Sequence, residues 1–254
     1  MSYRDYEPVD LARAGLFKIH QLESLEKDNI ENAFAGYVAE VLGKINDGKE
    51  ASVYLCRAED ESRGQLLAAK VFKARHFRNF NSDRSYRNFS KMRDKRMAKS
   101  MRSKSNRGEK AFHQHWVNSE WNMLNLLHEA GVRVPEPYAE FPDGVLMEFI
   151  GDAAGPAPRL INCKLSTADL ENIGAKLMRD IALMLEIDIV HGDLSPYNVL
   201  YNGEEPVIID VPQAMDLRTT PDGFSIMHRD LTNLDKYFQK LGVPLPFLGL
   251  LDNI

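Results

Sequence analysis

Apolar residues recur along this chain with two different periods, and each period predicts a different kind of element. Alternation of β-branched or aromatic residues with polar ones is typical of strands, whereas apolar residues three or four apart mark one face of a helix. The first pattern predicts a strand, a glycine-containing turn and a strand within 37–56, and further strands at 66–72 and 145–151. The second pattern predicts helices at 116–127, 170–185 and 231–241.

The first 36 residues form a lead-in to these elements. Their apolar residues recur at helical spacing with charges between them, at Leu16, Ile19, Leu22 and Leu25. We expect a helix that packs on the main domain rather than a separate module.

The polar loop after Val190 has the most informative spacing in the chain. Asp193 and Asn198 lie five positions apart between short apolar runs typical of buried strands, and Asp210 ends the next such run. A kinase-type phosphoryl-transfer loop uses a carboxylate to orient the attacking hydroxyl, and a carboxamide and a second carboxylate to hold magnesium. Two surface turns rich in Asp and Asn are the alternative. The flanking runs and the downstream carboxylate favour the kinase-type loop.

A lysine and a glutamate far apart in the sequence complete this pattern. Lys70 lies inside the apolar run at 66–72, where an unpaired ammonium is costly. Glu120 lies on the apolar face of the helix predicted at 116–127. An ion pair between the two would position ATP phosphates as in protein kinases. A lysine on an edge strand that points to water is the alternative for Lys70.

The turn within 37–56 contains a G-x-x-x-x-G-K sequence at 43–49, the start of a Walker motif. Glu50 follows in place of the Ser or Thr that binds magnesium, and a strand pattern follows in place of a helix. A hairpin that covers ATP phosphates fits better. The glycines alone fit a simple hairpin turn equally well.

Composition is consistent with one domain, or one domain of two lobes: the chain has 254 residues, 44% of them hydrophobic, and a formal charge of −5. Cys56 and Cys163 are its only cysteines, so a reducing cytosol is expected in place of a disulfide framework. The start of the chain is polar and acidic, unlike a signal peptide. The most apolar run, 181–190, is interrupted by Glu186 and Asp188, so we expect no membrane span and a cytoplasmic protein.

The modest net charge hides a basic segment. Residues 73–110 hold 14 Lys and Arg against three acids, a net charge of +11, while the rest of the chain holds 18 basic and 34 acidic residues, a net charge of −16. Few aliphatic residues interrupt this segment, so we expect a mobile insertion at about 75–110.

Together these segments resemble the RIO family of atypical serine kinases, most closely its type-one branch, over roughly 37–242. The resemblance rests on GKEASVY at 48–54, AK at 69–70, PEP at 135–137, MEFIG at 147–151, HGDLSPYN at 191–198 and IIDVPQ at 208–213. It implies an α+β, reduced two-lobed protein-kinase-like fold with an antiparallel N-lobe sheet plus one helix and a mostly helical C-lobe. The expected domain plan is a lead-in at 1–36 and a kinase domain at 37–254, with the N-lobe at about 37–147, the hinge at 148–151 and the C-lobe at about 152–254.

The resemblance also implies roles for individual residues. Asp193 is the catalytic aspartate, Asn198 and Asp210 are metal ligands, and Lys70 with Glu120 positions phosphate. The implied ATP-binding residues are Lys49, Ser52, Val53, Lys70, Met147, Glu148 and Ile150. Asp210 is also the implied acceptor of an aspartyl-phosphate during ATP hydrolysis.

Gly192 and Pro212 depart from the family pattern, whereas Ser195 departs only from the pattern of ordinary kinases. The family often has Ala where Gly192 stands, and His-Gly-Asp is also found in small-molecule phosphotransferases of the aminoglycoside and choline type. It often has Ser where Pro212 stands. Ser195 replaces the lysine of ordinary kinases, as in the RIO pattern. His191 is expected to be a structural core histidine.

The expected function is that of an ATP- and magnesium-dependent serine protein kinase or ATPase, with manganese as a substitute metal, acting on a protein substrate or on itself. The family resemblance also implies a role in ribosome maturation. The charge of the basic insertion predicts that it binds RNA or a pre-ribosomal particle. A small-molecule phosphotransferase and a nucleotide-gated RNA-binding scaffold are the alternatives. The first would need a larger helical subdomain after Asp210, and retention of Lys70, Glu120, Asp193, Asn198 and Asp210 argues against an idle scaffold.

Overall fold

The computed structural model describes residues 24–59, 65–73, 106–152 and 155–253. The chain divides into two compact units. The first unit comprises Met1–Trp121 and Pro137–Pro156, and the second comprises Asn122–Glu136 and Ala157–Ile254. The two units are described separately below.

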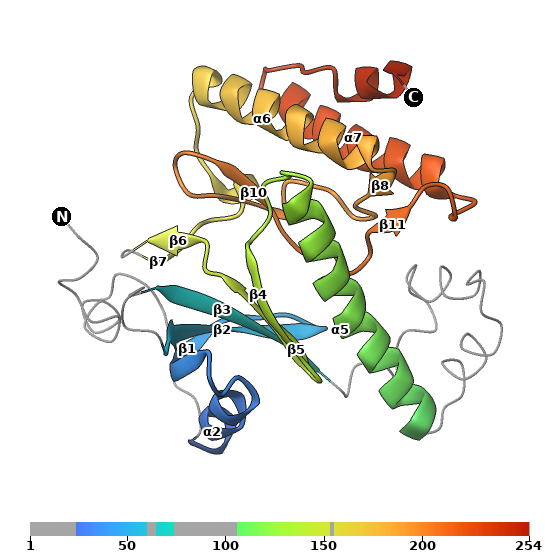
Figure 1. Cartoon of the computed structure of the whole chain (residues 1–254). Coiled ribbons are helices and arrows are strands. Elements are labelled where there is room, and N and C mark those ends of the chain that lie inside the picture. Colours follow the sequence, from blue (N-terminus) through green and yellow to red (C-terminus); the bar gives the residue numbers. More distant parts are fainter. Residues whose placement is uncertain (1–23, 60–64, 74–105, 153–154, 254) are drawn as a thin grey trace. The chain divides into compact units, whose positions relative to one another are not determined.

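The first unit is built on a five-stranded antiparallel sheet with the order β1-β2-β3-β5-β4 (Figure 1). Its strands are β1 (Val38–Asp47), β2 (Ala51–Ala58), β3 (Leu66–Phe72), β4 (Pro137–Phe141) and β5 (Gly144–Glu148). Two short strands, β6 (Gly151–Asp152) and β7 (Gly155–Pro156), pair with each other after β5. The predicted strands are confirmed at β1, β2, β3 and β5. β4 was missed because two prolines in the preceding connector indicated an irregular segment.

The helix α2 (Ser24–Ala33) covers one face of this sheet. Ile30 of α2 and Phe34, which directly follows the helix, are buried with Leu67 and Ala69 of β3, and the rings of Phe34 and Phe141 lie 4.3 Å apart between centroids. The described part of the lead-in therefore packs on the main domain. The predicted positions Leu16, Ile19 and Leu22 lie outside the described residues.

The helix α5 (Asn106–Glu129) is longer than its apolar pattern indicates. It begins at Asn106, before the predicted start at Trp116, so the last residues of the predicted mobile insertion are helical. Trp116, Val117, Leu124 and Leu127 are buried, as expected, and Met123 is only half-buried. Residues 74–105 of the insertion lie outside the described residues.

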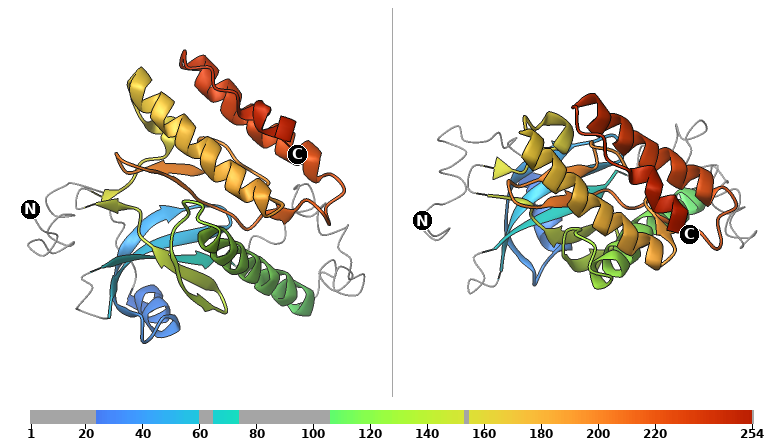
Figure 2. Two further views of the ribbon diagram at one scale, coloured as in Figure 1. Left: turned by 45° about the horizontal axis from the view of Figure 1, so that its top comes forward. Right: turned by 90° about the horizontal axis from the view of Figure 1, so that it is seen from above.

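The second unit places two long helices beside two strand pairs. The helices α6 (Thr167–Glu186) and α7 (Gly223–Lys240) lie side by side (Figures 1 and 2). The remaining elements are the 3-10 helices η3 (Leu160–Asn162) and η4 (Phe247–Asn253), the pair β9 (Val199–Tyr201) with β10 (Pro206–Ile208), and the pair β8 (Ile189–Val190) with β11 (Met215–Asp216).

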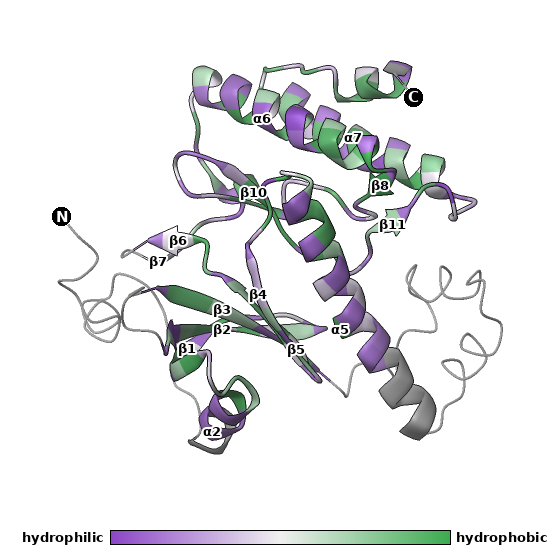
Figure 3. Ribbon diagram, in the orientation of Figure 1, coloured by the Kyte–Doolittle hydropathy of each residue, from purple (hydrophilic) through white to green (hydrophobic). Residues whose placement is uncertain are grey.

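Both long helices follow from their sequence patterns. Ser166 begins α6 with a capping box, in which its hydroxyl accepts from the N–H of Asp169 and the Asp169 carboxylate accepts from the N–H of Ser166. Hydrophobic and polar residues alternate around both helices (Figure 3). The predicted closing helix begins earlier than expected, at Gly223, and Leu241 lies after its end and is exposed rather than on the apolar face.

The predicted lobe boundaries differ from the observed units. Residues 122–136, which were expected in the N-lobe, belong to the second unit, and the expected hinge at 148–151 belongs to the first. Across the described ranges, none of the helices combines the length and the apolar character that crossing a bilayer requires.

Candidate functional site

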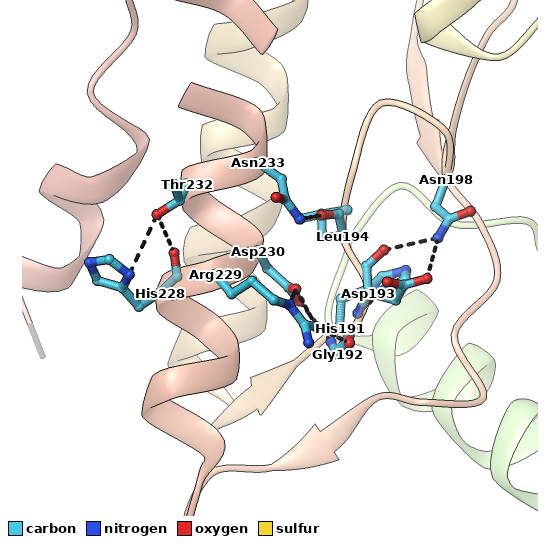
Figure 4. A network of polar contacts seen from close by, with 10 residues as sticks. All are labelled: His191, Gly192, Asp193, Leu194, Asn198, His228, Arg229, Asp230, Thr232 and Asn233. Atoms are coloured by element: carbon cyan, nitrogen blue, oxygen red, sulfur yellow. Dashed lines mark hydrogen bonds and ion pairs between the residues drawn. The ribbon is translucent and has the colours of Figure 1, made fainter. Parts of the chain in front are cut away.

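In the second unit, the loop between β8 and β9 holds the predicted Asp193 and Asn198 against each other (Figure 4). The side-chain amide nitrogen of Asn198 donates to the backbone oxygen of Asp193 at 2.9 Å and approaches its carboxylate at 3.4 Å. Asn198 is buried, whereas the Asp193 side chain is exposed. The amide thus orients a carboxylate that remains accessible to a substrate.

The buried His191 links this loop to the strand that precedes Asp210. Its Nε2 lies 3.0 Å from the backbone oxygen of Ile209, and its Nδ1 accepts from the N–H of Asp193 at 3.3 Å. The two contacts together require an Nε2-protonated ring. His191 therefore has the structural role that the sequence predicts.

Asp210 follows β10 in an uncommon backbone conformation, with φ of 67°. Aspartate tolerates this left-handed region better than most residues. The preceding Ile209 is held on both sides, because its N–H donates to the backbone oxygen of Asn198 at 3.0 Å and its oxygen accepts from His191. These contacts fix the backbone next to Asp210, whose side chain is exposed, relative to the loop.

The pKa of Asp193 is raised above its usual value, first by desolvation and then by the negative charges of Asp230 and Asp210. His191 and the guanidinium of Arg229 oppose this shift. The carboxylates of Asp193 and Asp210 therefore lie within electrostatic reach of each other, as residues serving one reaction centre must.

Three residues of α7 that the sequence reading missed hold the backbone of the loop (Figure 4). The buried carboxylate of Asp230 accepts from the N–H of Gly192 at 2.9 Å, and the Arg229 guanidinium donates to the backbone oxygen of Gly192. The Asn233 amide donates to the backbone oxygen of Leu194 at 3.3 Å. Asp230 lies one position before the helix predicted at 231–241, and a carboxylate next to the apolar Leu231 is the signal that could have revealed it.

Gly192 departs from the family pattern for a local reason. Its φ is +86°, and a Cβ at this position would collide with the backbone oxygen of Gln213. An alanine here would need a different backbone path. The loop of this chain is therefore built around a glycine.

In the first unit, Lys70 and Glu120 form the predicted ion pair. The Lys70 Nζ lies 2.6 Å from Glu120 Oε2, and both side chains are largely removed from solvent, at 12% and 1% exposure. A buried pair of this kind is costly to break, because either partner alone would be an uncompensated charge. The Lys70 ammonium also lies over the ring of Phe72, 5.4 Å from its centroid.

A second polar contact, which the sequence reading missed, joins α5 to the sheet. The His113 Nε2 lies 2.9 Å from a carboxylate oxygen of Asp143 in the turn between β4 and β5, and the ring of His113 packs edge-on against Phe72. No local sequence pattern predicts this contact, because the two residues are 30 positions apart.

Three of the predicted nucleotide residues of the first unit, Val53, Lys70 and Met147, share one face of the sheet. Lys70 pairs across the sheet with Val53 and Val145, and Ala68 pairs with Met147. Directly opposed residues point to the same side. This face is opposite to the one covered by α2, to which Leu67 and Ala69 belong.

The remaining predicted residues lie at the ends of strands. Lys49 is exposed in the turn between β1 and β2, and Ser52 is buried with its hydroxyl donated to Asp47 at 2.7 Å. Glu148 ends β5 and is half-buried, and Ile150 is buried just after it. Their binding roles stay predictions.

The donor set of Asn198 and Asp210 is suited to a hard cation. Mg²⁺ prefers oxygen ligands and usually takes one or two from protein, completing its shell with phosphate oxygens and water. Because Asn198 and Asp210 both offer oxygen donors, they fit a magnesium ion that completes its shell with the phosphate oxygens of a nucleotide.

These features define a class of protein. An antiparallel sheet whose third strand carries a lysine paired with a helix glutamate, and a loop with Asp193, Asn198 and a downstream Asp210, make this a reduced protein-kinase-like α+β fold. The Rio2 kinase of Chaetomium thermophilum, solved as an ADP/Mg²⁺-phosphoaspartate complex, matches with a TM-score of 0.62 over 95% of this chain and 72% of that chain. At 20% identity, this likeness concerns the fold alone.

The sequence comparisons identify the family. A model of the RIO domain matches residues 52–247, and the chain therefore belongs to the RIO family. Serine/threonine-protein kinase RIO1 of Caenorhabditis elegans is 31% identical over 211 residues, which cover 83% of this chain and 39% of the relative. The RIO-type serine/threonine-protein kinase Rio1 of Thermoplasma acidophilum is 34% identical over 50% of this chain and 66% of the relative. These names support the type-one branch.

This chain is much shorter than some of these relatives. It spans 39% of the length of the C. elegans RIO1 kinase and 35% of that of human RIO1, to which it is 29% identical. The similarity therefore concerns a domain of those proteins.

Proposed function

We propose that this chain is an ATP- and magnesium-dependent protein kinase domain that transfers the γ-phosphate of ATP to serine, including serines of its own. The observation that carries this proposal is the accessible Asp193 carboxylate, whose backbone is held by hydrogen bonds to the buried Asn198 and His191. A carboxylate on a fixed backbone and open to solvent is suited to orient a hydroxyl and accept its proton.

Each residue of the site has a distinct task in this proposal. Asp193 accepts the proton of the attacking serine hydroxyl, and its raised pKa favours that transfer. Lys70, held by Glu120, binds ATP phosphates. Asn198 and Asp210 would hold Mg²⁺, which neutralises phosphate charge when it is bound.

The same site supports an ATPase reaction through Asp210. A carboxylate oxygen of Asp210 would attack the γ-phosphorus and ADP would leave, and water would then hydrolyse the acyl phosphate to release inorganic phosphate. The exposed Asp210 side chain, in its left-handed backbone conformation, is accessible for this attack. The similar Rio2 structure is of a phosphoaspartate complex, which supports the proposal by likeness of fold.

The kinase and ATPase reactions are separated by the chemistry of the product. The purified chain is incubated with labelled ATP and magnesium or manganese, and the phosphate is mapped by mass spectrometry. A hydroxylamine-labile phosphate on Asp210 supports the acyl-phosphate route, and a hydroxylamine-stable phosphate supports transfer to serine. Absence of both products, together with absence of ADP formation, would contradict the proposed function.

We also propose that the basic segment at 75–110 binds RNA or a pre-ribosomal particle and that the protein acts in the cytosol, in ribosome maturation. The support is the sequence charge of +11 over residues 73–110 and the two unpaired cysteines. With about five phosphates engaged, the log–log slope of affinity against salt should be roughly −3.5 to −4.5. Deleting 78–105, which leaves α5 intact, should flatten this slope. An unchanged slope, or no RNA binding at low salt, would contradict the RNA proposal.

A further inference from the structure

We propose that Asp47 and Lys73 act as a clip that fixes the turn between β1 and β2, so that Lys49 is presented to the nucleotide phosphates in a preset position. This inference deepens the proposed function, on which its reference to a nucleotide rests. Asp47 and Lys73 are positioning residues here, not catalytic ones.

The clip joins Lys73, which directly follows β3, to residues on both sides of the turn. The Lys73 Nζ forms an ion pair with Asp47 and donates to the backbone oxygen of Gly48 at 2.8 Å. The backbone N–H of Lys73 donates to the oxygen of Glu50, also at 2.8 Å. A single residue therefore contacts three positions of the turn.

The turn has further contacts of its own that close it. The hydroxyl of the buried Ser52 donates to the same Asp47 oxygen at 2.7 Å, and the N–H of Gly48 donates to the oxygen of Ala51 at 2.9 Å. Asp47 thus accepts from both a lysine and a serine. Removing this carboxylate would release both donors at once.

The charges identify which lysine is available to a ligand. The hydrogen bonds from Lys73 and then from Ser52 lower the pKa of Asp47 to about 2, so this carboxylate is ionised at neutral pH. It compensates the charge of Lys73, whose side chain is 30% exposed. Lys49, at the exposed part of the turn, is the lysine that the clip presents to an anionic ligand.

A preset turn matters because a glycine-containing turn has many accessible conformations. Ordering it at the moment of binding would cost conformational entropy, and fixing it beforehand reduces that cost. Lys70 lies on β3, and Lys73 directly follows this strand. The strand that carries Lys70, the lysine proposed to bind phosphate, therefore also leads to the lysine that holds the turn. The clip links the two phosphate-contacting parts of the first unit.

The test is a double-mutant cycle on nucleotide affinity. Lys73→Met, Asp47→Ala and the double variant are compared with the wild type by titration with Mg-ATP and by initial rates. Lys27→Met is the matched control, since Lys27 is 36% exposed and pairs with Glu40 at 3.2 Å in the same unit. Lys73→Arg tests rescue, and amide exchange at Gly48 reports the turn without nucleotide.

If the clip exists, each single variant weakens Mg-ATP binding by about threefold to tenfold, the range expected for lost preorganisation and a lost exposed ion pair. The double variant is no weaker than either single variant, KM changes more than kcat, and Lys73→Arg restores most of the affinity. Exchange at Gly48 becomes faster in both single variants. Lys27→Met matches the wild type in every measurement.

Two results would overturn the clip. Weakening by Lys73→Met alone, or additive weakening in the double variant, would mean that Lys73 contacts the nucleotide directly. Wild-type affinity and wild-type exchange at Gly48 in both single variants would mean that the contacts do not fix the turn. The proposed function fails separately, if the wild type does not bind Mg-ATP or if Lys70→Met leaves turnover unchanged, and amide exchange then still decides whether the clip exists.

Discussion

The loop that carries Asp193 and the turn that carries Lys49 are held by different kinds of contact. The loop is anchored by buried groups, since His191, Asp230 and Asn198 are all less than a tenth exposed. The turn is held by Asp47 and Lys73, which are 54% and 30% exposed. Buried hydrogen bonds to charged groups are worth more than solvent-exposed ion pairs.

This difference indicates how the domain divides its work. A group that must meet a hydroxyl within hydrogen-bond distance needs a fixed position, and buried anchors provide it. The role proposed for the turn, presenting Lys49 to phosphates, asks for a preset position at the surface, and exposed contacts can provide it. The expected effects of mutation follow the same division.

The largest expected effect is at the centre of the loop. Asp193→Asn should reduce phosphoryl transfer by several powers of ten, equivalent to about 3–5 kcal/mol in activation free energy, while Mg-ATP binding is retained. Because the pKa of Asp193 is raised, the wild-type rate should increase with pH through a value above the usual aspartate range, and the variant should lack this increase. Single-turnover rates measured across pH check both expectations. A variant with wild-type turnover would remove Asp193 from the mechanism.

The next effect tests the anchor beneath the loop. Asp230→Ala leaves the buried N–H of Gly192 without its acceptor, and should lower the free energy of unfolding by about 3 kcal/mol and reduce turnover as well. Gln239→Ala, at an exposed position of the same helix, is the control. Urea denaturation and turnover measured together check this expectation. An effect no larger than that of the control would mean that the loop is held by other contacts.

A smaller effect concerns Asp180, a buried carboxylate on α6. Burial raises its pKa to about 6, despite a hydrogen bond from the backbone of Arg133 and the opposing charge of Arg179. Such a group stabilises the fold below its unfolded pKa near 3.8, and this contribution is lost as pH rises through about 6. Relative to Asp180→Asn, the wild type should therefore lose about 2–3 kcal/mol of stability between pH 4 and pH 7.5.

Urea denaturation at several pH values measures this difference. Glu171→Gln, which removes an exposed carboxylate from the same helix, is the control. The backbone oxygen of Arg133 also accepts from the N–H of Ile208, in the strand before Asp210, at 2.9 Å. A pH-independent difference between the wild type and Asp180→Asn would show that this carboxylate is not buried in solution.

The smallest effect on stability is expected in the turn. Asp47→Ala should change the free energy of unfolding by about 1 kcal/mol, less than Asp230→Ala does, because Asp47 and Lys73 are exposed and Ser52 is the one buried donor among the contacts named here. It should nevertheless weaken nucleotide binding. Thermal denaturation without nucleotide and with saturating Mg-ATP separates the two. A loss of stability comparable to that of Asp230→Ala would contradict the view that the turn is held more weakly than the loop.

The sequence predicts the residues that are proposed to act and misses several of the residues that hold them. The spacing of Asp193, Asn198 and Asp210 is local, and Lys70 and Glu120 each stand out as charges within apolar patterns. Asp230 lies 38 positions from Gly192, and Lys73 lies 26 positions from Asp47. Contacts of side chains with distant backbone groups depend on tertiary structure, which no periodicity encodes.

Element ends were also harder to predict than element cores. The helix α5 begins before its apolar stripe because polar residues from Asn106 onward continue the same hydrogen-bonded turns. β4 begins at a proline, a residue that the sequence reading treated as a strand breaker. Both errors lie at the ends of elements, where the apolar pattern does not mark the boundary.

The account is tested most directly by measuring single-turnover phosphoryl transfer and Mg-ATP affinity on the same preparations of wild type, Asp193→Asn and Asp47→Ala. We predict that Asp193→Asn loses transfer and binds Mg-ATP like the wild type, whereas Asp47→Ala binds more weakly and transfers at a near wild-type rate once ATP is saturating. Wild-type transfer by Asp193→Asn, or loss of transfer at saturating ATP in Asp47→Ala, would contradict the account.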